Sequence, residues 1–190
     1  MPRVREFDVE EVLSKAMMVF WRKGYENTSI QDLLKAMGLN KGSLYGSFHD
    51  KKTLFKRTLD YYDYKRRNDM LLTGQPLKDI QSFMNRIVDN SYTSVQGIWG
   101  CFIFNTSMDL EEQDQAFRDE VSAKVRWTED FFYKALCEAK RLDQVRQDLD
   151  CRAVAQILFG AVFSIIGLAK SCHDKTLLNN IAKGALAHLK

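Results

Sequence analysis

The chain has 190 residues, of which 45% are hydrophobic and 28% are charged, and this composition excludes an intrinsically disordered protein. Its net charge of +3 is unevenly placed, because the first 67 residues carry 14 Lys and Arg against 9 Asp and Glu, whereas the remainder is slightly acidic. A basic first part on an acidic body favours a DNA-binding protein with a separate second domain. Uneven scatter of solvated charge explains the same numbers equally well.

The few helix-breaking residues and the spacing of the cysteines narrow the class of protein further. Only 2 prolines and 10 glycines interrupt the chain, which favours long helices over many short strands. The 4 cysteines form no C-x-x-C pair, and the charged segment Met1–Glu11 contains no apolar region of a signal peptide. We therefore expect a cytoplasmic protein that has neither a metal site nor a cofactor.

The first predicted elements are helices with clear capping signals. Asp8 precedes apolar residues that recur three and four positions apart until Gly24, where we expect a helix to end. The segment Thr28-Ser29-Ile30-Gln31 has the form of a capping box with Thr28 as the N-cap. It opens a short helix that Gly38 ends.

Two more helices follow in the first third of the chain. Asn40 caps a short helix over 41–48, and Asp50 caps a long one that runs toward Leu72. The four residues 37–40 fit the glycine turn of a helix-turn-helix motif. Taken alone, this spacing is not specific, since any corner between two helices shows it.

A longer set of residues carries a family signature. The matching residues lie in one unbroken register: Gly24-Tyr25, Thr28-Ser29-Ile30, Leu33, Met37-Gly38-Leu39, Lys41-Gly42-Ser43-Leu44-Tyr45, Phe48, Lys51 and Leu54-Phe55. This segment resembles the DNA-binding signature of the TetR (tetracycline-repressor) family. Ser47 and Lys52 depart from its commonest form, which has His or Tyr at the first position and often an acidic residue at the second.

The resemblance implies an all-α fold in two parts. Residues 1–49 would form a three-helix, helix-turn-helix DNA-binding domain, and 50–73 a connecting helix. Residues 74–190 would form a larger helical domain for effector binding and dimerisation. After the break at 73–76, five helical segments are predicted, giving about nine helices in all. They cover 77–96, 101–110, 114–141, 149–171 and 174–189.

The predicted recognition helix begins with the residues that would read DNA. Lys41, Gly42, Ser43 and Tyr45 lie on its first turns, the part that enters the major groove. Lys41 and Ser43 can reach base edges, although a lysine contacts phosphate equally readily. Gly42 lets the backbone approach the duplex closely.

Residues that flank this helix are expected to contact the DNA backbone. The resemblance implies that Tyr45 and His49 bind sugar and phosphate. Thr28 and Lys51 are predicted at helix N-termini, where N–H groups and the helix dipole favour a phosphate. The alternatives are that Thr28 is only a cap and that Tyr45 is a packed aromatic.

The middle of the chain is rich in large apolar side chains. In the family this domain commonly encloses a ligand cavity, so the resemblance implies a small apolar or aromatic effector. The candidate lining residues are Trp99, Phe104, Met108, Trp127 and Phe131. Any one of them is more simply explained as core.

Cys101 is the candidate sensor. It follows Gly97 and Gly100 and is predicted at a helix start, where the dipole lowers the pKa of an exposed thiol. The segment 100–105 resembles a G-C-[LF]-x-x-N stretch found in one branch of the family. The alternative is a small buried hydrophobic residue.

The last two helices are predicted to form a dimer interface. Segment 153–169 carries only Gln156 and Ser164 as polar side chains, but its length is at the lower limit for a membrane span, so we expect it to be buried in protein. Gly160, Ser164 and Gly167 allow a second helix to approach. The resemblance implies a four-helix interface between two subunits, and the alternative is packing within one chain.

These features predict a homodimeric repressor that releases a palindromic duplex DNA operator when a small molecule or thiol-reactive compound binds the second domain. Two alternatives belong to other classes. One is an architectural or activating DNA-binding protein without an effector. The other is a thiol enzyme built on Cys101, which is disfavoured because no histidine is patterned as its base, so we expect no enzymatic activity.

Overall fold

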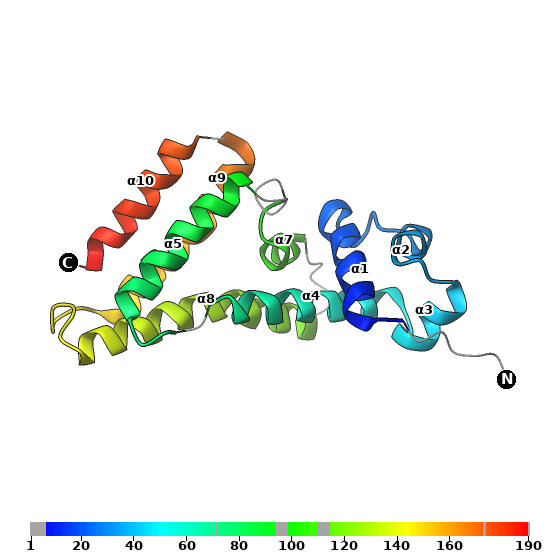
Figure 1. The fold of residues 1–190 in the computed structure, drawn as a ribbon, viewed down its shortest axis with the longest axis horizontal. Coiled ribbons are helices and arrows are strands. Elements are labelled where there is room, and N and C mark those ends of the chain that lie inside the picture. The colour runs from blue at the N-terminus through cyan, green and yellow to red at the C-terminus, as the bar shows by residue number, and fades with distance from the viewer. Residues whose placement is uncertain (1–6, 71, 94–98, 110–114, 173, 190) are drawn as a thin grey trace. The chain divides into compact units, whose positions relative to one another are not determined.

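The computed structural model describes residues 7–70, 72–93, 99–109, 115–172 and 174–189. Within these ranges the chain forms nine α-helices, one short 3₁₀ helix and no strand (Figure 1). It divides into two compact units, Met1–Arg67 and Asn68–Lys190. The predicted all-α fold class is confirmed.

The first unit contains the first four helices. Their bounds are α1 Val9–Lys23, α2 Ile30–Met37, α3 Lys41–Phe48 and α4 Lys51–Asn68. Asp8 caps α1 as predicted, since its Oδ1 accepts from Glu10 N–H at 2.9 Å. Gly24 ends α1 with a φ of +77°, which favours glycine because side chains with a Cβ are strained there.

Aromatic side chains fill the core of this unit. Phe20 of α1 meets Phe55 of α4 with ring centroids 4.9 Å apart, and the Tyr25 ring lies 4.9 Å from the same Phe55 ring. Leu33 of α2 and Leu44 of α3 are fully buried. Each of the four helices therefore has an apolar side in one core, which fixes the orientation of the short helices α2 and α3.

The predicted capping box of α2 was one residue out of register. Ser29, not Thr28, is the N-cap: its Oγ accepts from Asp32 N–H at 3.1 Å, and Asp32 Oδ2 accepts from Ser29 N–H at 3.0 Å. Thr28 is 1% exposed, and its hydroxyl donates to the Gly24 carbonyl at 2.6 Å. Because this contact occupies the Thr28 hydroxyl, the cap passes to the next hydroxyl residue, and Asp32 takes the place expected for Gln31.

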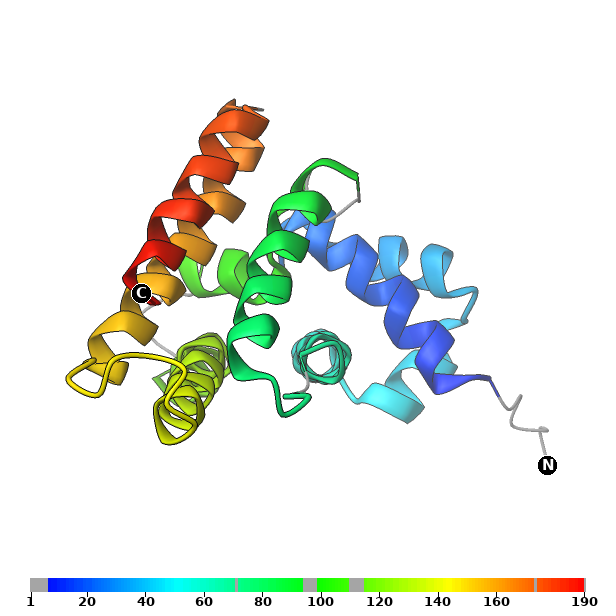
Figure 2. The same ribbon diagram turned by 60° about the vertical axis from the view of Figure 1, so that its left-hand side comes forward.

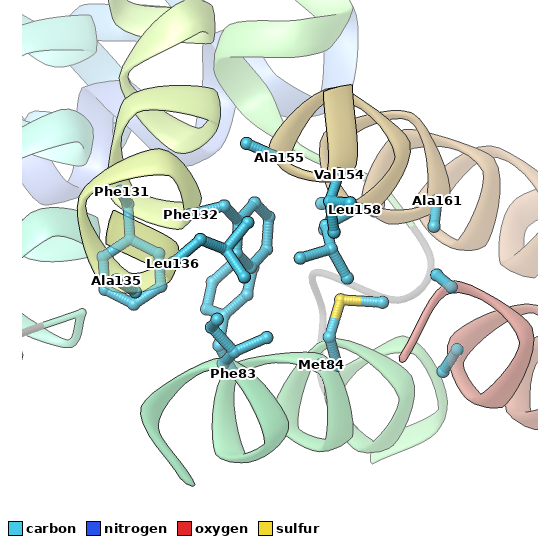
Figure 3. Close-up of a cluster of buried hydrophobic side chains, with 14 of the residues drawn as sticks. Phe83, Met84, Phe131, Phe132, Ala135, Leu136, Val154, Ala155, Leu158 and Ala161 are labelled. Carbon is cyan, nitrogen blue, oxygen red and sulfur yellow. The ribbon is translucent and has the colours of Figure 1, made fainter. Parts of the chain in front are cut away.

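The second unit contains the other helices. Their bounds are α5 Pro76–Thr93, α7 Phe102–Asp109, α8 Gln115–Arg141, α9 Cys151–Cys172, α10 Lys175–Leu186 and the 3₁₀ helix Ala187–Leu189. The apolar helix α9 packs against α5, α8 and α10, and Figure 2 shows it running alongside α10. Figure 3 shows the core where Phe83 and Met84 of α5 meet Phe132 of α8 and Leu158 of α9.

Helix α9 is long and apolar enough, by length and composition, to cross a membrane. In the structure one side of it is covered by α5, α8 and α10, which agrees with the prediction that it packs within protein. However, only 33% of its most apolar 18-residue stretch is buried. A large part of this apolar helix therefore still faces solvent within one chain.

Candidate nucleic-acid interface

The turn between α2 and α3 fixes the angle at which α3 leaves the core. Gly38 adopts a left-handed conformation with φ 69° and ψ 26°, and its N–H donates to the Leu34 carbonyl. Leu39 N–H donates to the same carbonyl at 3.2 Å. Asn40 then caps α3, because its Oδ1 accepts from Ser43 N–H at 2.8 Å.

Helix α3 has one buried and one bare side. Leu44 and Phe48 are at most 1% exposed and hold the helix to the core. Exposed residues form the other side, and Ser43 is half-buried at its edge. The exposed residues of α3 are Lys41, Gly42, Tyr45, Gly46 and Ser47.

Tyr45 is part of the exposed side of α3. Its side chain is 39% exposed, so the alternative that it is a packed core aromatic does not fit the structure. The Lys41 ammonium lies 5.9 Å from the centroid of the Tyr45 ring, one helical turn away. A cation and an aromatic hydroxyl thus stand together on this face.

Two glycines lie one turn apart on the same side, and the fold requires neither. A Cβ on Gly42 would have only an ordinary contact, 3.4 Å from Asn40 Oδ1, and a Cβ on Gly46 would meet nothing within 4 Å. Glycine inside a helix costs about 0.5–1 kcal/mol relative to alanine. Gly42 was predicted from the sequence to face DNA, whereas Gly46 was not, although their spacing of four residues places both on one side of a helix.

The flanking candidates are placed differently from one another. His49 is exposed and caps the end of α3 with a φ of 64°. Lys51 is half-buried, with its ammonium 4.3 Å from the Tyr25 ring centroid and 3.5 Å from the Glu26 carbonyl. Both therefore lie at the edge of the bare side of α3, where α4 begins.

Thr28 is not at the surface. Its N–H donates to the Tyr25 carbonyl at 3.3 Å and its hydroxyl to the Gly24 carbonyl, so both of its donors are satisfied inside the chain. The structure therefore gives Thr28 a positioning role, in which it orders the turn before α2. Exposed Ser29 takes its place at the helix N-terminus.

Electrostatic contacts secure α2 beneath this face. Lys23 Nζ lies 2.7 Å from Asp32 Oδ1, and the bond from Lys23, followed by the bonds from Ser29, lowers the pKa of Asp32 to about 2. The carboxylate therefore remains charged at neutral pH. It joins the end of α1 to the first turn of α2.

The effector candidates lie in the second unit and differ in their contacts and exposure. Trp127 stacks on Phe131 with ring centroids 6.1 Å apart, whereas Phe104 lies 4.3 Å from Phe163 of α9. Phe131 is 6% exposed and belongs to the core, as its alternative interpretation held. Met108 is 73% exposed, and Trp99 is half-buried.

Cys101 sits in a tightly bonded turn before α7. Its carbonyl accepts from Asn105 N–H at 2.8 Å, and Asn105 Nδ2 donates to the Trp99 carbonyl at 2.5 Å. Gly100 has a φ of 75°, and a Cβ there would lie 3.2 Å from Asn105 Oδ1. The helix start was predicted correctly, and the 7% exposure of Cys101 fits the alternative of a small buried residue and not the exposed thiol of a sensor.

Comparisons with known proteins agree with this architecture. The family model for bacterial regulatory proteins of the tetR family matches residues 12–58, and the tetracyclin repressor-like C-terminal domain model matches residues 76–185. The transcriptional regulator YezE of Bacillus subtilis is 28% identical over 186 residues, or 95% of each chain. The transcriptional repressor ComR of Escherichia coli is 26% identical over 160 residues, or 82% of this chain and 76% of the relative.

Solved structures give the same result. A cysteine variant of the TetR family regulator CifR, in complex with 26-base-pair operator DNA, superposes with a TM-score of 0.83. It is 26% identical, with 96% of this chain and 97% of that one covered. A TetR regulator from Chloroflexus aurantiacus shares the fold: it is 22% identical with a TM-score of 0.82, and the match covers 94% of this chain and 92% of that one. Since a family model covers more than half of the sequence, the chain belongs to the TetR family of DNA-binding transcriptional regulators.

Proposed function

We propose that this regulator is a homodimeric cytoplasmic repressor that reads a palindromic operator with α3 and releases it when an effector binds the second unit. The DNA-binding part of this proposal rests on the exposed side of α3. There Lys41, Tyr45 and two glycines that the fold does not require face solvent. Relatives named as repressors and the operator complex of CifR support it.

The two glycines have a physical explanation in DNA binding. Gly42 and Gly46 leave a strip of helix backbone without side chains between the exposed residues. A helix in the major groove can then lie closer to the bases than one whose surface carries Cβ atoms. The stability that the glycines cost the free protein is recovered in contacts with the duplex.

Gly46→Ala is expected to stabilise the protein and weaken DNA binding at the same time. Alanine should add about 0.5–1 kcal/mol of helix stability, because the position is helical and open. The methyl group should lower operator affinity about tenfold or more, equivalent to 1.4 kcal/mol or more. Thermal melting measures the first effect, and fluorescence anisotropy on a duplex selected from random sequences measures the second.

Ser122→Ala is the matched control, because Ser122 is exposed on α8 and gains helix propensity in the same way. It should raise stability without changing affinity. Unchanged affinity in Gly46→Ala would show that this side of α3 does not approach DNA.

The exposed apolar side of α9 supports a dimer. Ala153, Ile157, Gly160, Ser164 and Gly167 are exposed and recur three and four positions apart, so they form one stripe. Small residues in this stripe permit close approach of another helix. We infer that a second copy of the chain covers it, since two reading helices related by a twofold axis are what a palindromic operator requires.

The effector part of the proposal rests on the turn that holds Cys101. Trp99 and Phe104 flank it in sequence, and Phe104 contacts α9 through Phe163. A small aromatic electrophile that reached the buried thiol would have to open the turn between Gly100 and Asn105. A coupling free energy of about 1–3 kcal/mol between such a change and DNA binding would alter operator affinity about 5- to 150-fold.

Cys101→Ser is expected to abolish the response to electrophiles. p-Benzoquinone should release the wild-type protein from its operator and leave the Cys101→Ser variant bound, because serine lacks the nucleophilic sulfur. Anisotropy competition before and after treatment measures this. Cys172→Ser is the control: Cys172 is exposed, and its loss should leave release intact. Equal release from both variants would rule out Cys101 as the sensor.

A further inference from the structure

Residues on one face of α8 contact the beginning of α9 and the residues just before it. Arg152 Nη1 donates to Glu129 Oε1 at 3.2 Å, and the Arg152 guanidinium carbon lies 3.7 Å from the Tyr133 ring centroid. Two turns further along, Lys140 Nζ donates to the Leu149 carbonyl at 3.0 Å. Positions 129, 133 and 140 share one side of the helix, because residues three, four and seven apart lie above one another.

Cys137 lies on this side, between the two anchors. It follows Tyr133 by one turn and precedes Lys140 by one turn, and it therefore faces the residues that open α9. Cys151 is the first residue of α9, and its Sγ donates to the Leu149 carbonyl at 3.9 Å. Burial, and then the adjacent Cys137 thiol, raise the pKa of Cys151. Cys151 belongs to the buried core of the second unit and Cys137 packs against that core from α8, so two reduced cysteines from neighbouring helices come together there.

The two thiols differ in access and in partners. Cys137 is half-buried, whereas Cys151 is 9% exposed. The neighbouring Cys137 thiol is the main cause that raises the pKa of Tyr133. A small oxidant therefore reaches Cys137 first, whereas burial shields the Cys151 thiol beside it from the oxidant. This is the arrangement of an attacking and a resolving cysteine.

We propose that Cys137 and Cys151 form a redox-active dithiol that a hydroperoxide converts into a disulfide between α8 and α9. The Cys137 sulfur attacks a peroxide oxygen, so that an S–O bond forms as the O–O bond breaks, giving a sulfenic acid and water. The Cys151 sulfur then attacks the sulfenic sulfur. The S–S bond forms as the S–O bond breaks, and the departing hydroxide takes the Cys151 proton as water.

In sum, two thiols and one hydrogen peroxide give one disulfide and two waters, and a thiol reductant reverses the change. The bond would close residues 138–150, which are the last turn of α8 and the connection to α9, into a covalent loop. Such a cross-link restricts the unfolded chain, so the oxidised protein should melt at a higher temperature than the reduced protein.

The test uses the full chain with Cys101→Ser and Cys172→Ser, so that only the proposed pair remains. Hydrogen peroxide is the probe. Intact mass should fall by about 2 Da as two hydrogens are lost, and neither thiol should then react with iodoacetamide. Tryptic mapping should find the two cysteine peptides linked, and dithiothreitol should restore both thiols.

Adding Cys137→Ser or Cys151→Ala to that background should abolish both the mass loss and the rise in melting temperature. Cys137 is half-buried, so its serine variant provides the control even where removal of the buried Cys151 impairs folding. Oxygen addition without a linked peptide, or a cross-link between two chains, would overturn the proposal. The readouts require no DNA and are therefore independent of the proposed repressor function.

Discussion

Replacing Ile157 by glutamate is expected to give a folded monomer that binds operator at least about a hundredfold more weakly. Ile157 is 41% exposed in the single chain and has the largest side chain of the exposed stripe on α9, so glutamate costs the isolated subunit little. In a dimer, two such carboxylates would be buried without partners near the twofold axis. An uncompensated buried charge costs about 3–5 kcal/mol, which is more than a hundredfold in affinity.

Sedimentation velocity and anisotropy on operator DNA measure the two effects. Leu142→Glu is the matched control, because Leu142 is a similarly exposed apolar residue (38%) in the connection after α8. It should leave both association and DNA binding unchanged. If Ile157→Glu sediments as a dimer, the stripe on α9 is not the subunit interface, and another surface must pair the reading helices.

The parts of the fold that the sequence predicted are those governed by local chemistry. Asp8, Gly24, Gly38 and Asn40 act at the helix ends where capping and turn preferences placed them. The family signature then placed the buried and exposed sides of the recognition helix. Periodicity located the helices of the second unit to within a few residues, apart from predicted ends at 94–96 and 110, which lie outside the described residues.

What sequence reasoning missed depends on contacts between distant residues. Thr28 and Ser29 are equivalent N-cap candidates by residue type, and the hydrogen bond from the buried Thr28 hydroxyl to the Gly24 carbonyl decides between them. For Cys101 the sequence left an exposed thiol and a small buried residue as alternatives, and tertiary packing decides for the buried one. The pair Cys137 and Cys151 is 14 positions apart and carries no motif, so only the packing of α8 on α9 reveals it.

Phe132→Ala is expected to cause the largest loss of stability among the substitutions considered. Phe132 is 0% exposed, and its ring meets Phe83 at 5.3 Å and Phe131 at 5.5 Å between centroids (Figure 3). It comes from α8 and packs between the apolar sides of α5 and α9, so no single helix can move in to fill the space. Truncation of such a residue costs about 3–5 kcal/mol, from lost burial and a remaining cavity.

That cost is a large share of the total stability of a domain, about 5–15 kcal/mol. The melting temperature should accordingly fall by roughly 10 °C, measured by calorimetry or circular dichroism. Phe132→Leu, which keeps most of the volume, should lose markedly less. Lys134→Ala, at an exposed position of the same helix, should stay within about 0.5 kcal/mol of wild type. A loss below about 1 kcal/mol in Phe132→Ala would mean that α5, α8 and α9 collapse onto the vacated site, against the close packing of this core.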